Sequence, residues 1–167
     1  MTGGPPVVLI GPMAAGKTRL GKRIARILGT GFQDTDKIIV AENGPIPALF
    51  DEHGEAHFRE LERDAVARAL ATDDVVALGG GAVLAPETQA LLAAHRVVFV
   101  TVTAEAVAPR IADGRRPLVR GGLPDWERIY TERRPIYEQL ALLTVDTSHR
   151  PIDAVAQEVA EWSTQTA

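Results

Sequence analysis

Two kinds of hydrophobic pattern alternate along the chain. Short runs of apolar residues, several of them rich in valine, are separated by longer segments in which apolar residues return every three or four positions. The short runs are typical of buried strands, and the longer pattern predicts helices with one apolar face. The strands that we expect are 6–11, 31–34, 75–81, 96–102 and 142–147.

The expected helices lie between these strands, and glycine and proline mark many of their ends. Gly29 closes the first helix, Gly54 separates two helices, and Asp125 caps a later one. We expect Pro109 to interrupt its helix and Pro135 to kink the next. The helices that we expect are 17–28, 35–42, 47–54, 55–71, 86–95, 104–114, 125–141 and one that starts at Pro151, with a loop at 115–124.

The order of these elements predicts an α/β fold. Strands that alternate with helices form a mostly parallel sheet with helices on both faces. No repeat or linker divides the sequence, so we expect one domain over residues 1–167. Ligands of such sheets bind at the carboxyl ends of the strands, and the residues that follow each strand are therefore the candidates for function.

Composition and charge narrow the function classes. The net charge is -4, which disfavours nucleic acid as a partner. No apolar run approaches the roughly 20 residues of a membrane helix, and the first residues lack the pattern of a signal peptide. The chain has no cysteine, so disulfides are excluded. We expect a cytoplasmic monomer that binds neither nucleic acid nor membranes.

A phosphate-binding motif follows the first strand. The sequence "GPMAAGKT" at 11–18 matches G-x-x-x-x-G-K-[ST], with a strand before it and a helix after it. Backbone N–H groups of such a loop surround phosphate oxygens, and the site implies a nucleoside triphosphate with Mg²⁺. Lys17 is expected to reach the β- and γ-phosphates, and Thr18 to reach the metal. The candidate nucleotide ligands here are Gly11, Ala14, Ala15, Gly16, Lys17, Thr18 and Arg19.

Alanine at position 14 of this loop affects its expected backbone. Unlike glycine, alanine enters the left-handed region only with strain. We therefore expect right-handed conformations at Ala14, in a comparatively stiff loop.

The acid that would help to hold the metal has two candidates. The third strand ends in glycines and supplies only backbone, whereas Asp34 ends the second strand and Asp146 ends the fifth. We favour Asp34, with Thr18, as the Mg²⁺ site. The alternative is that Asp34 caps the helix that starts at Thr35. Asp36 lies two residues further on, and we expect it to face the acceptor substrate instead.

Three arginines on separate elements suit a small anionic substrate. Arg59 has Glu62 three positions later, where it can brace the guanidinium on one helix face. Arg116 lies in the loop after the fourth strand, and Arg133 lies in the helix after it. Arginine binds carboxylate or phosphate through two hydrogen bonds, so the set predicts a polyanion site.

Together these segments resemble the shikimate kinase family. The resemblance rests on "GPMAAGKT", "DTD" at 34–36, "FR" at 58–59 followed by Glu62, "LGGGA" at 78–82, "RRPL" at 115–118 and "ERRPIY" at 132–137. They occur in the order and spacing of the family and cover nearly the whole chain. The phosphate loop alone is widespread, but the combination is specific.

The resemblance implies a fold and an activity. The expected fold is like that of nucleoside monophosphate kinases, with five parallel strands in the order 2-3-1-4-5. A substrate-binding helical region at about 35–62 and a lid at about 112–125 would flank the core. The expected reaction is phosphorylation of the 3-hydroxyl of shikimate by ATP and Mg²⁺, on the route to chorismate. The carboxylate clamp would serve shikimate and a close analogue such as aminoshikimate alike.

The resemblance also implies roles for single residues. Asp36 would hold substrate hydroxyls, Arg59 and Arg133 the carboxylate, and Gly80 with Gly81 would contact substrate through the backbone. Arg116 would act from the lid on the transferred phosphate. The catalytic set is Lys17, Asp36 and Arg116, while Arg110 and Arg150 would border the adenine.

Two other readings stay open from the residues alone. The chain could be another small kinase with a phosphate loop, acting on gluconate or a nucleoside monophosphate. It could also be a nucleotide-binding protein without catalysis. The histidines lack metal-ligand spacing, and Trp126 and Trp162 are expected to be packing residues.

Overall fold

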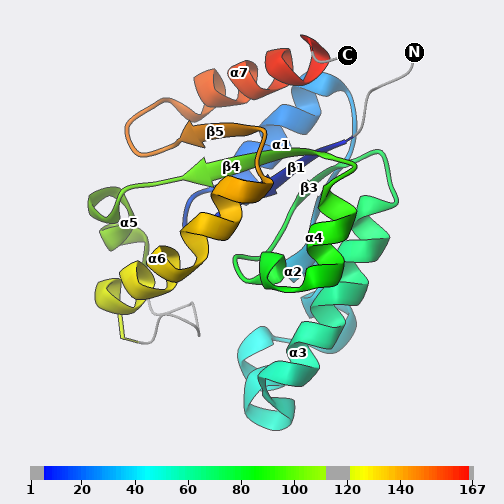
Figure 1. The fold of residues 1–167 in the computed structure, drawn as a ribbon, viewed down its shortest axis with the longest axis vertical. Coiled ribbons are helices and arrows are strands. Elements are labelled where there is room, and N and C mark those ends of the chain that lie inside the picture. Colours follow the sequence, from blue (N-terminus) through cyan, green and yellow to red (C-terminus); the bar gives the residue numbers. More distant parts are fainter. Residues whose placement is uncertain (1–5, 112–120, 166–167) are drawn as a thin grey trace.

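A computed structural model describes residues 6–111 and 121–165. Five strands form one sheet in the order β2-β3-β1-β4-β5 (Figure 1). All four neighbouring pairs are parallel, which confirms the predicted topology. The strands are β1 (Val7–Ile10), β2 (Phe32–Asp34), β3 (Val75–Ala77), β4 (Arg96–Thr101) and β5 (Leu143–Asp146).

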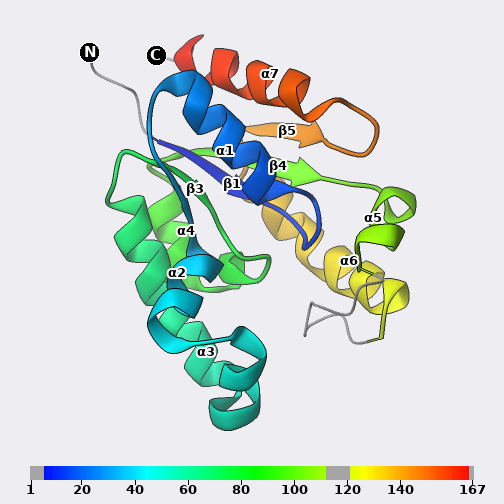
Figure 2. The ribbon, with the colours of Figure 1, turned by 180° about the vertical axis from the view of Figure 1, so that it is seen from behind.

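Helices connect the strands in the predicted alternation. They are α1 (Lys17–Leu28), α2 (Thr35–Asn43), α3 (Ile46–Leu70), the 3₁₀ turn η1 (Ala82–Leu84), α4 (Pro86–Leu92), α5 (Ala104–Ile111), α6 (Leu123–Leu140) and α7 (Ile152–Gln165). Helices α1 and α7 cover one face of the sheet, and α4 and α6 lie over the other (Figures 1 and 2). Helix α3 extends beyond the sheet at the bottom of Figure 1.

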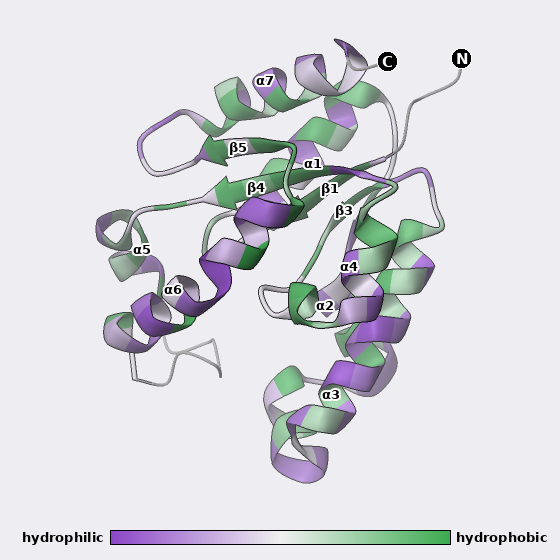
Figure 3. Cartoon of the chain, in the orientation of Figure 1, coloured by the Kyte–Doolittle hydropathy of each residue, from purple (hydrophilic) through white to green (hydrophobic). Residues whose placement is uncertain are grey.

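The apolar pattern of the strands is explained by burial on both faces. Every residue of β1 and β3 is buried, as is the centre of β4. The hydropathy view shows apolar strands in the interior and polar residues on the outer surfaces of α3 and α6 (Figure 3). Because the strands are parallel, their carboxyl ends meet at one edge and bring the loops after them together.

A second, smaller cluster of apolar residues packs α2 against α3. It consists of Ile39, Leu49, Phe58 and Ala65. Helix α3 contains a break at Gly54, whose φ of 83° and ψ of 171° are not helical. This confirms the predicted division, and it lets the segment before Gly54 turn back toward α2.

Several expected element ends were wrong. Helix α6 begins at Leu123 and not at Asp125, because Pro124 fits the first turn of a helix, where its missing N–H is no loss. Asp125 instead accepts a hydrogen bond from the N–H of Gly121 at 3.1 Å. Helix α5 continues through Pro109, since a proline near the end of a short helix removes only one bond. Helix α4 ends at Leu92, before the expected residue 95.

Candidate functional site

One large cavity lies at the carboxyl ends of the strands. Its volume is about 950 Å³, and its walls come from the phosphate loop, α1, α2, α3 and the glycines after β3. Ten of the predicted site residues line it: Ala14, Gly16, Lys17, Thr18, Arg19, Asp34, Asp36, Arg59, Gly80 and Gly81. Fold topology thus brings residues from four segments of the sequence into one space.

Side chains hold the carbonyl groups of the phosphate loop. Five successive carbonyl groups, from Gly11 to Ala15, each accept a hydrogen bond from a side chain. The donors to these five carbonyls are Lys17 Nζ at 2.7 and 2.8 Å, Trp126 Nε1 at 2.8 Å, Arg110 Nη1 at 2.7 Å and Thr147 Oγ1 at 2.7 Å. The carbonyl and N–H of a trans peptide point in opposite directions. The distant donors to the carbonyls of Met13, Ala14 and Ala15 therefore turn the N–H groups that follow these carbonyls in the opposite direction, as an anion-binding loop requires.

Ala14 corrects one expectation about this loop. Its φ is 64°, so it occupies the left-handed region that the sequence argued against. A loop that converges its N–H groups on an anion alternates right- and left-handed residues. The geometry that such an anion-binding loop requires, together with the bond from Arg110 to the Ala14 carbonyl, outweighs the preference of alanine for right-handed backbone conformations.

Asp34 has two roles, one for each carboxylate oxygen. Oδ1 accepts from the backbone N–H of Asp36 at 2.9 Å and of Lys37 at 3.3 Å, which caps α2. Oδ2 accepts a short hydrogen bond from the Thr18 hydroxyl. The cap and the link to the phosphate loop therefore exist together. Asp146, the other metal candidate, is exposed and accepts from the N–H of Ser148 at 2.8 Å within its own turn.

Asp36 lies on the cavity side of the same turn. Withdrawal from water is the main cause that raises the pKa of this carboxyl to about 6, followed by the charges of Asp34 and Glu62. Lys17 and Arg59 act in the opposite direction. A carboxylate in this range is a stronger proton acceptor than an ordinary aspartate.

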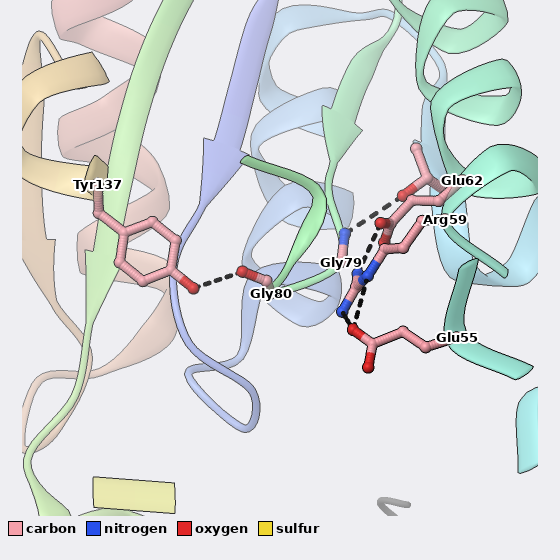
Figure 4. A network of polar contacts seen from close by, with 7 residues as sticks. Glu55, Arg59, Glu62, Gly79, Gly80 and Tyr137 are labelled. Carbon is pink, nitrogen blue, oxygen red and sulfur yellow. Dashed lines mark hydrogen bonds and ion pairs between the residues drawn. The ribbon is translucent and has the colours of Figure 1, made fainter. Parts of the chain in front are cut away.

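The guanidinium of Arg59 is held in place by two glutamates of its own helix. Its Nη1 donates to Glu62 Oε1 at 2.7 Å, and its Nε and Nη2 lie 3.3 Å from Glu55 Oε2 (Figure 4). Glu62 is 3% exposed, and burial raises the pKa of its carboxyl despite the neighbouring guanidinium of Arg59. This confirms the predicted pairing and fixes Arg59 beside Gly81.

The glycines after β3 have no side chains, so three residues that we expect to bind substrate can lie close to their backbone. A Cβ at Gly79 would lie 2.7 Å from Asp36 Oδ1, and one at Gly81 would lie 2.6 Å from Arg59 Nη1. For a Cβ at Gly80, the nearest side-chain atom would be Arg133 Nη1, at 3.5 Å. Any larger residue at Gly79 or Gly81 would displace a polar group of the cavity. We name residues 79–81 the glycine turn.

Comparison with known proteins decides the family. The sequence model of shikimate kinase matches residues 13–164. The chain belongs to the shikimate kinase family. This confirms the resemblance that the sequence motifs indicated.

Relatives within the shikimate kinase family are similar over nearly their whole lengths. The shikimate kinase of Salinispora arenicola is 44% identical over 160 residues, covering 93% of this chain and 96% of that protein. That of Thermobifida fusca is 44% identical over 165 residues, covering 96% of each. The structure of shikimate kinase from Acinetobacter baumannii in complex with shikimate has a TM-score of 0.90 at 30% identity, covering 95% of this chain and 92% of that one.

A kinase with lower sequence identity has a similar fold. A gluconokinase from Sinorhizobium meliloti has a TM-score of 0.64 at 17% identity and covers 98% of this chain and 93% of its own. This likeness shows the shared fold and no more.

Not every residue expected from the shikimate kinase pattern lines the cavity. Arg110 contacts the outside of the phosphate loop, and Arg150 pairs with Glu158 on α7 at 2.6 Å. Their contacts with adenine stay predictions. Arg116, and most of the lid expected at about 112–125, lie outside the described residues.

Sequence reasoning missed the residues that support the site. Trp126 packs in the core as expected, but it also donates to the phosphate loop. Thr147, after β5, and Tyr137, in the quoted "ERRPIY", also donate to site backbone. An apolar wall was missed as well, although its prolines and aromatics are visible in 45–58: Val40, Pro45, Ile46, Pro47, Phe50 and Phe58.

Two absences hold for the described part of the chain. Within residues 6–111 and 121–165, no helix is long and apolar enough to cross a membrane. In the same residues, no group of three or more histidine or acidic side chains is arranged to hold a metal ion. The expectations of a monomer, of the cytoplasm and of no nucleic acid partner stay predictions.

Proposed function

We propose that this protein transfers the γ-phosphoryl group of ATP to the 3-hydroxyl of shikimate, giving shikimate 3-phosphate and ADP. Membership of the shikimate kinase family supports this activity. The observation that carries it is a single cavity in which a phosphate loop faces braced arginine and aspartate side chains across a glycine turn.

The phosphate loop binds the nucleotide in this proposal. Its N–H groups and the start of α1 surround the β- and γ-phosphates. The ammonium group of Lys17 contacts the carbonyls of Gly11 and Pro12 in this loop, and from there it can move to phosphates bound by the loop. Arg110 and Arg150 are proposed to border the adenine.

Thr18 and Asp34 fit Mg²⁺. A hydroxyl and a carboxylate are the hard oxygen ligands that this ion takes, and the two groups already contact one another at the start of α1. Mg²⁺ bound there would neutralise charge on the phosphates and orient them. With the metal present, the Thr18 hydroxyl would turn its lone pair toward the ion, and Asp34 would keep its cap on α2 through Oδ1.

The acceptor lies against the glycine turn. Arg59 and Arg133 hold the carboxylate of shikimate from two sides, and Asp36 accepts hydrogen bonds from its hydroxyls. The 3-hydroxyl oxygen forms a bond to the γ-phosphorus while the bond to the bridging oxygen of ADP breaks, and the hydroxyl proton passes to Asp36. Arg116, placed here from the family resemblance, would stabilise charge on the transferred group.

An assay of ADP release tests the function. The purified protein is given ATP and Mg²⁺ with shikimate, gluconate, AMP or CMP in parallel. We expect release that depends on shikimate and stays at the level without acceptor for the other three. Equal or greater release with gluconate or a nucleoside monophosphate would replace the proposed acceptor. ATP binding without release for any acceptor would make the protein a nucleotide-binding protein without catalysis.

A further inference from the structure

The glycine turn needs an external constraint. Glycine visits more backbone conformations than any other residue, so three in succession do not hold one shape alone. Three bonds fix the outer residues. Gly79 N–H donates to Thr35 Oγ1 at 3.2 Å, and the carbonyls of Gly79 and Gly81 accept from the N–H groups of Ala82 and Leu84, each at 3.1 Å. The central peptide, between Gly80 and Gly81, is fixed differently.

Tyr137 reaches this central peptide from the core. Its hydroxyl donates to the Gly80 carbonyl at 2.5 Å, and its side chain is 1% exposed. The ring packs against Phe99, with centroids 5.2 Å apart, and near Tyr130 at 6.4 Å. A hydroxyl on so well-packed a ring has little freedom, so it sets the direction of the carbonyl that it bonds.

The direction of that carbonyl determines where the next N–H points. In a trans peptide the Gly81 N–H points opposite to the Gly80 carbonyl. Tyr137 lies on one side of the glycine turn and Arg59 on the other (Figure 4). The Gly81 N–H therefore points away from Tyr137, toward the side on which Arg59 lies.

The same tyrosine is linked to the second arginine of the clamp. Arg133 lies one turn before Tyr137 on α6, so the two side chains share a helix face. Burial raises the pKa of the Tyr137 phenol to about 12, although the charge of Arg133 and its hydrogen bond to the phenol act in the opposite direction. The hydroxyl thus stays protonated and keeps its donor role at any pH near neutral.

We propose that Tyr137 is a positioning residue for the acceptor: its hydroxyl aims the Gly81 N–H at the bound substrate and keeps Arg133 beside the glycine turn. The inference rests on the proposed function and adds to it a residue that touches neither substrate. Tyr137 acts through the peptide and the guanidinium, so its removal affects acceptor binding and leaves nucleotide binding unchanged.

The test compares two conservative variants on one helix. Tyr137→Phe removes the hydroxyl and keeps the ring. Tyr130→Phe is the matched control, because its buried hydroxyl pairs with Thr101, away from the glycine turn. We expect Tyr137→Phe to raise the KM for shikimate about three- to tenfold, as the loss of one oriented hydrogen bond implies, with the KM for ATP unchanged. Tyr130→Phe should change neither KM.

Each result of this comparison has one meaning. If Tyr137→Phe leaves the KM for shikimate unchanged, or if both variants raise both KM values equally, Tyr137 is structural only and the inference fails. If the wild-type protein releases no ADP with shikimate, the proposed function itself fails. These two failures are distinguished by the wild-type assay alone.

A measurement on the wild-type protein covers the case in which Tyr137→Phe does not fold. The chain is labelled with ¹⁵N-glycine, and the assigned amide resonance of Gly81 is followed as shikimate is added. We expect it to move more than that of Gly29, which ends α1. A Gly81 resonance that stays in place at saturating shikimate would overturn the inference without any variant.

Discussion

At the scale of single residues, two neighbouring aspartates have separate tasks. Asp34 uses both oxygens within the protein, on α2 and on Thr18, whereas Asp36 keeps its carboxylate for the cavity. At the start of α2, a spacing of two residues directs the two carboxylates to different partners. The pair therefore joins the nucleotide side of the site to the acceptor side.

Replacing Asp36 by asparagine should separate binding from chemistry. The asparagine side chain would still fill the space beside Gly79 but would not accept the proton, so we expect Asp36→Asn to lower kcat with shikimate at least about 100-fold. ATP affinity, measured by titration calorimetry, should stay within about twofold of wild type. Asp73→Asn, in the turn before β3, is the control for loss of a carboxylate and should be fully active. Near-normal kcat in Asp36→Asn would remove Asp36 from the reaction.

Because Ala14 has a left-handed backbone, replacement by glycine should raise the free energy of unfolding at Ala14 and lower it at Ala15. Ala14→Gly removes strain of about 1–2 kcal/mol and adds about 0.5–1 kcal/mol of backbone entropy, so we expect a gain in unfolding free energy of about 0.5–1 kcal/mol. Ala15 is fully buried, and Ala15→Gly loses both a packed methyl and backbone order. We expect it to lose about 1–2 kcal/mol. Urea unfolding measures both, and a loss in Ala14→Gly as large as in Ala15→Gly would contradict the strain.

At the scale of elements, α6 supports both halves of the cavity. Trp126, in its first turns, donates to Met13 in the phosphate loop, and Tyr137, near its end, donates to Gly80. One helix thus fixes a carbonyl in the phosphate loop and a carbonyl in the glycine turn, which are the proposed nucleotide and acceptor sites. Substitutions at its two ends should affect the two substrates separately.

Trp126→Phe tests the nucleotide end of α6. Phenylalanine keeps most of the packing but leaves the Met13 carbonyl without its donor, at a loss of about 1–2 kcal/mol of stability. We expect the KM for ATP to rise about three- to tenfold while the KM for shikimate stays constant, the reverse of Tyr137→Phe. Trp162→Phe, on α7, controls for loss of an indole and should change neither KM. A higher KM for shikimate in Trp126→Phe would show that the two ends of α6 are not separable.

The sequence predicted elements better than their contacts. Strands and most helices followed from local periodicity, the parallel sheet followed from the alternation of strands and helices, and the strand order followed from the family resemblance. The first residue of α6 was missed because Pro124 allows an earlier start than the polar Asp125 suggested. The donors to the phosphate loop were missed for a different reason. Trp126 and Thr147 lie 113 and 132 residues away from the carbonyls that they bond, and no local pattern encodes such a pair.

At the scale of the whole molecule, two hydrophobic clusters differ greatly in size. The larger cluster joins the sheet to α1, α6 and α7 and holds the phosphate loop. The smaller one has four buried residues, Ile39, Leu49, Phe58 and Ala65, between α2 and α3. Asp36 and Arg59 are carried by the small cluster, whereas Lys17 and Arg133 are carried by the large one. Asp36 and Arg59 therefore rest on the smaller of the two clusters, opposite residues that rest on the larger one.

This difference predicts two levels of protection in hydrogen exchange. Segments open locally at a free energy set by the contacts that they lose, so amides of 36–58 should exchange faster than those of β1 and β4. In the proposed complex, shikimate would join the two parts through Arg59 and Arg133, and it should slow exchange in 36–58 in proportion to its occupancy. ADP should slow exchange mainly at 11–18 and leave 36–58 nearly unchanged. Exchange measured by mass spectrometry checks this, and equal rates in 36–58 and β1 without ligand would show that the two clusters open as one unit.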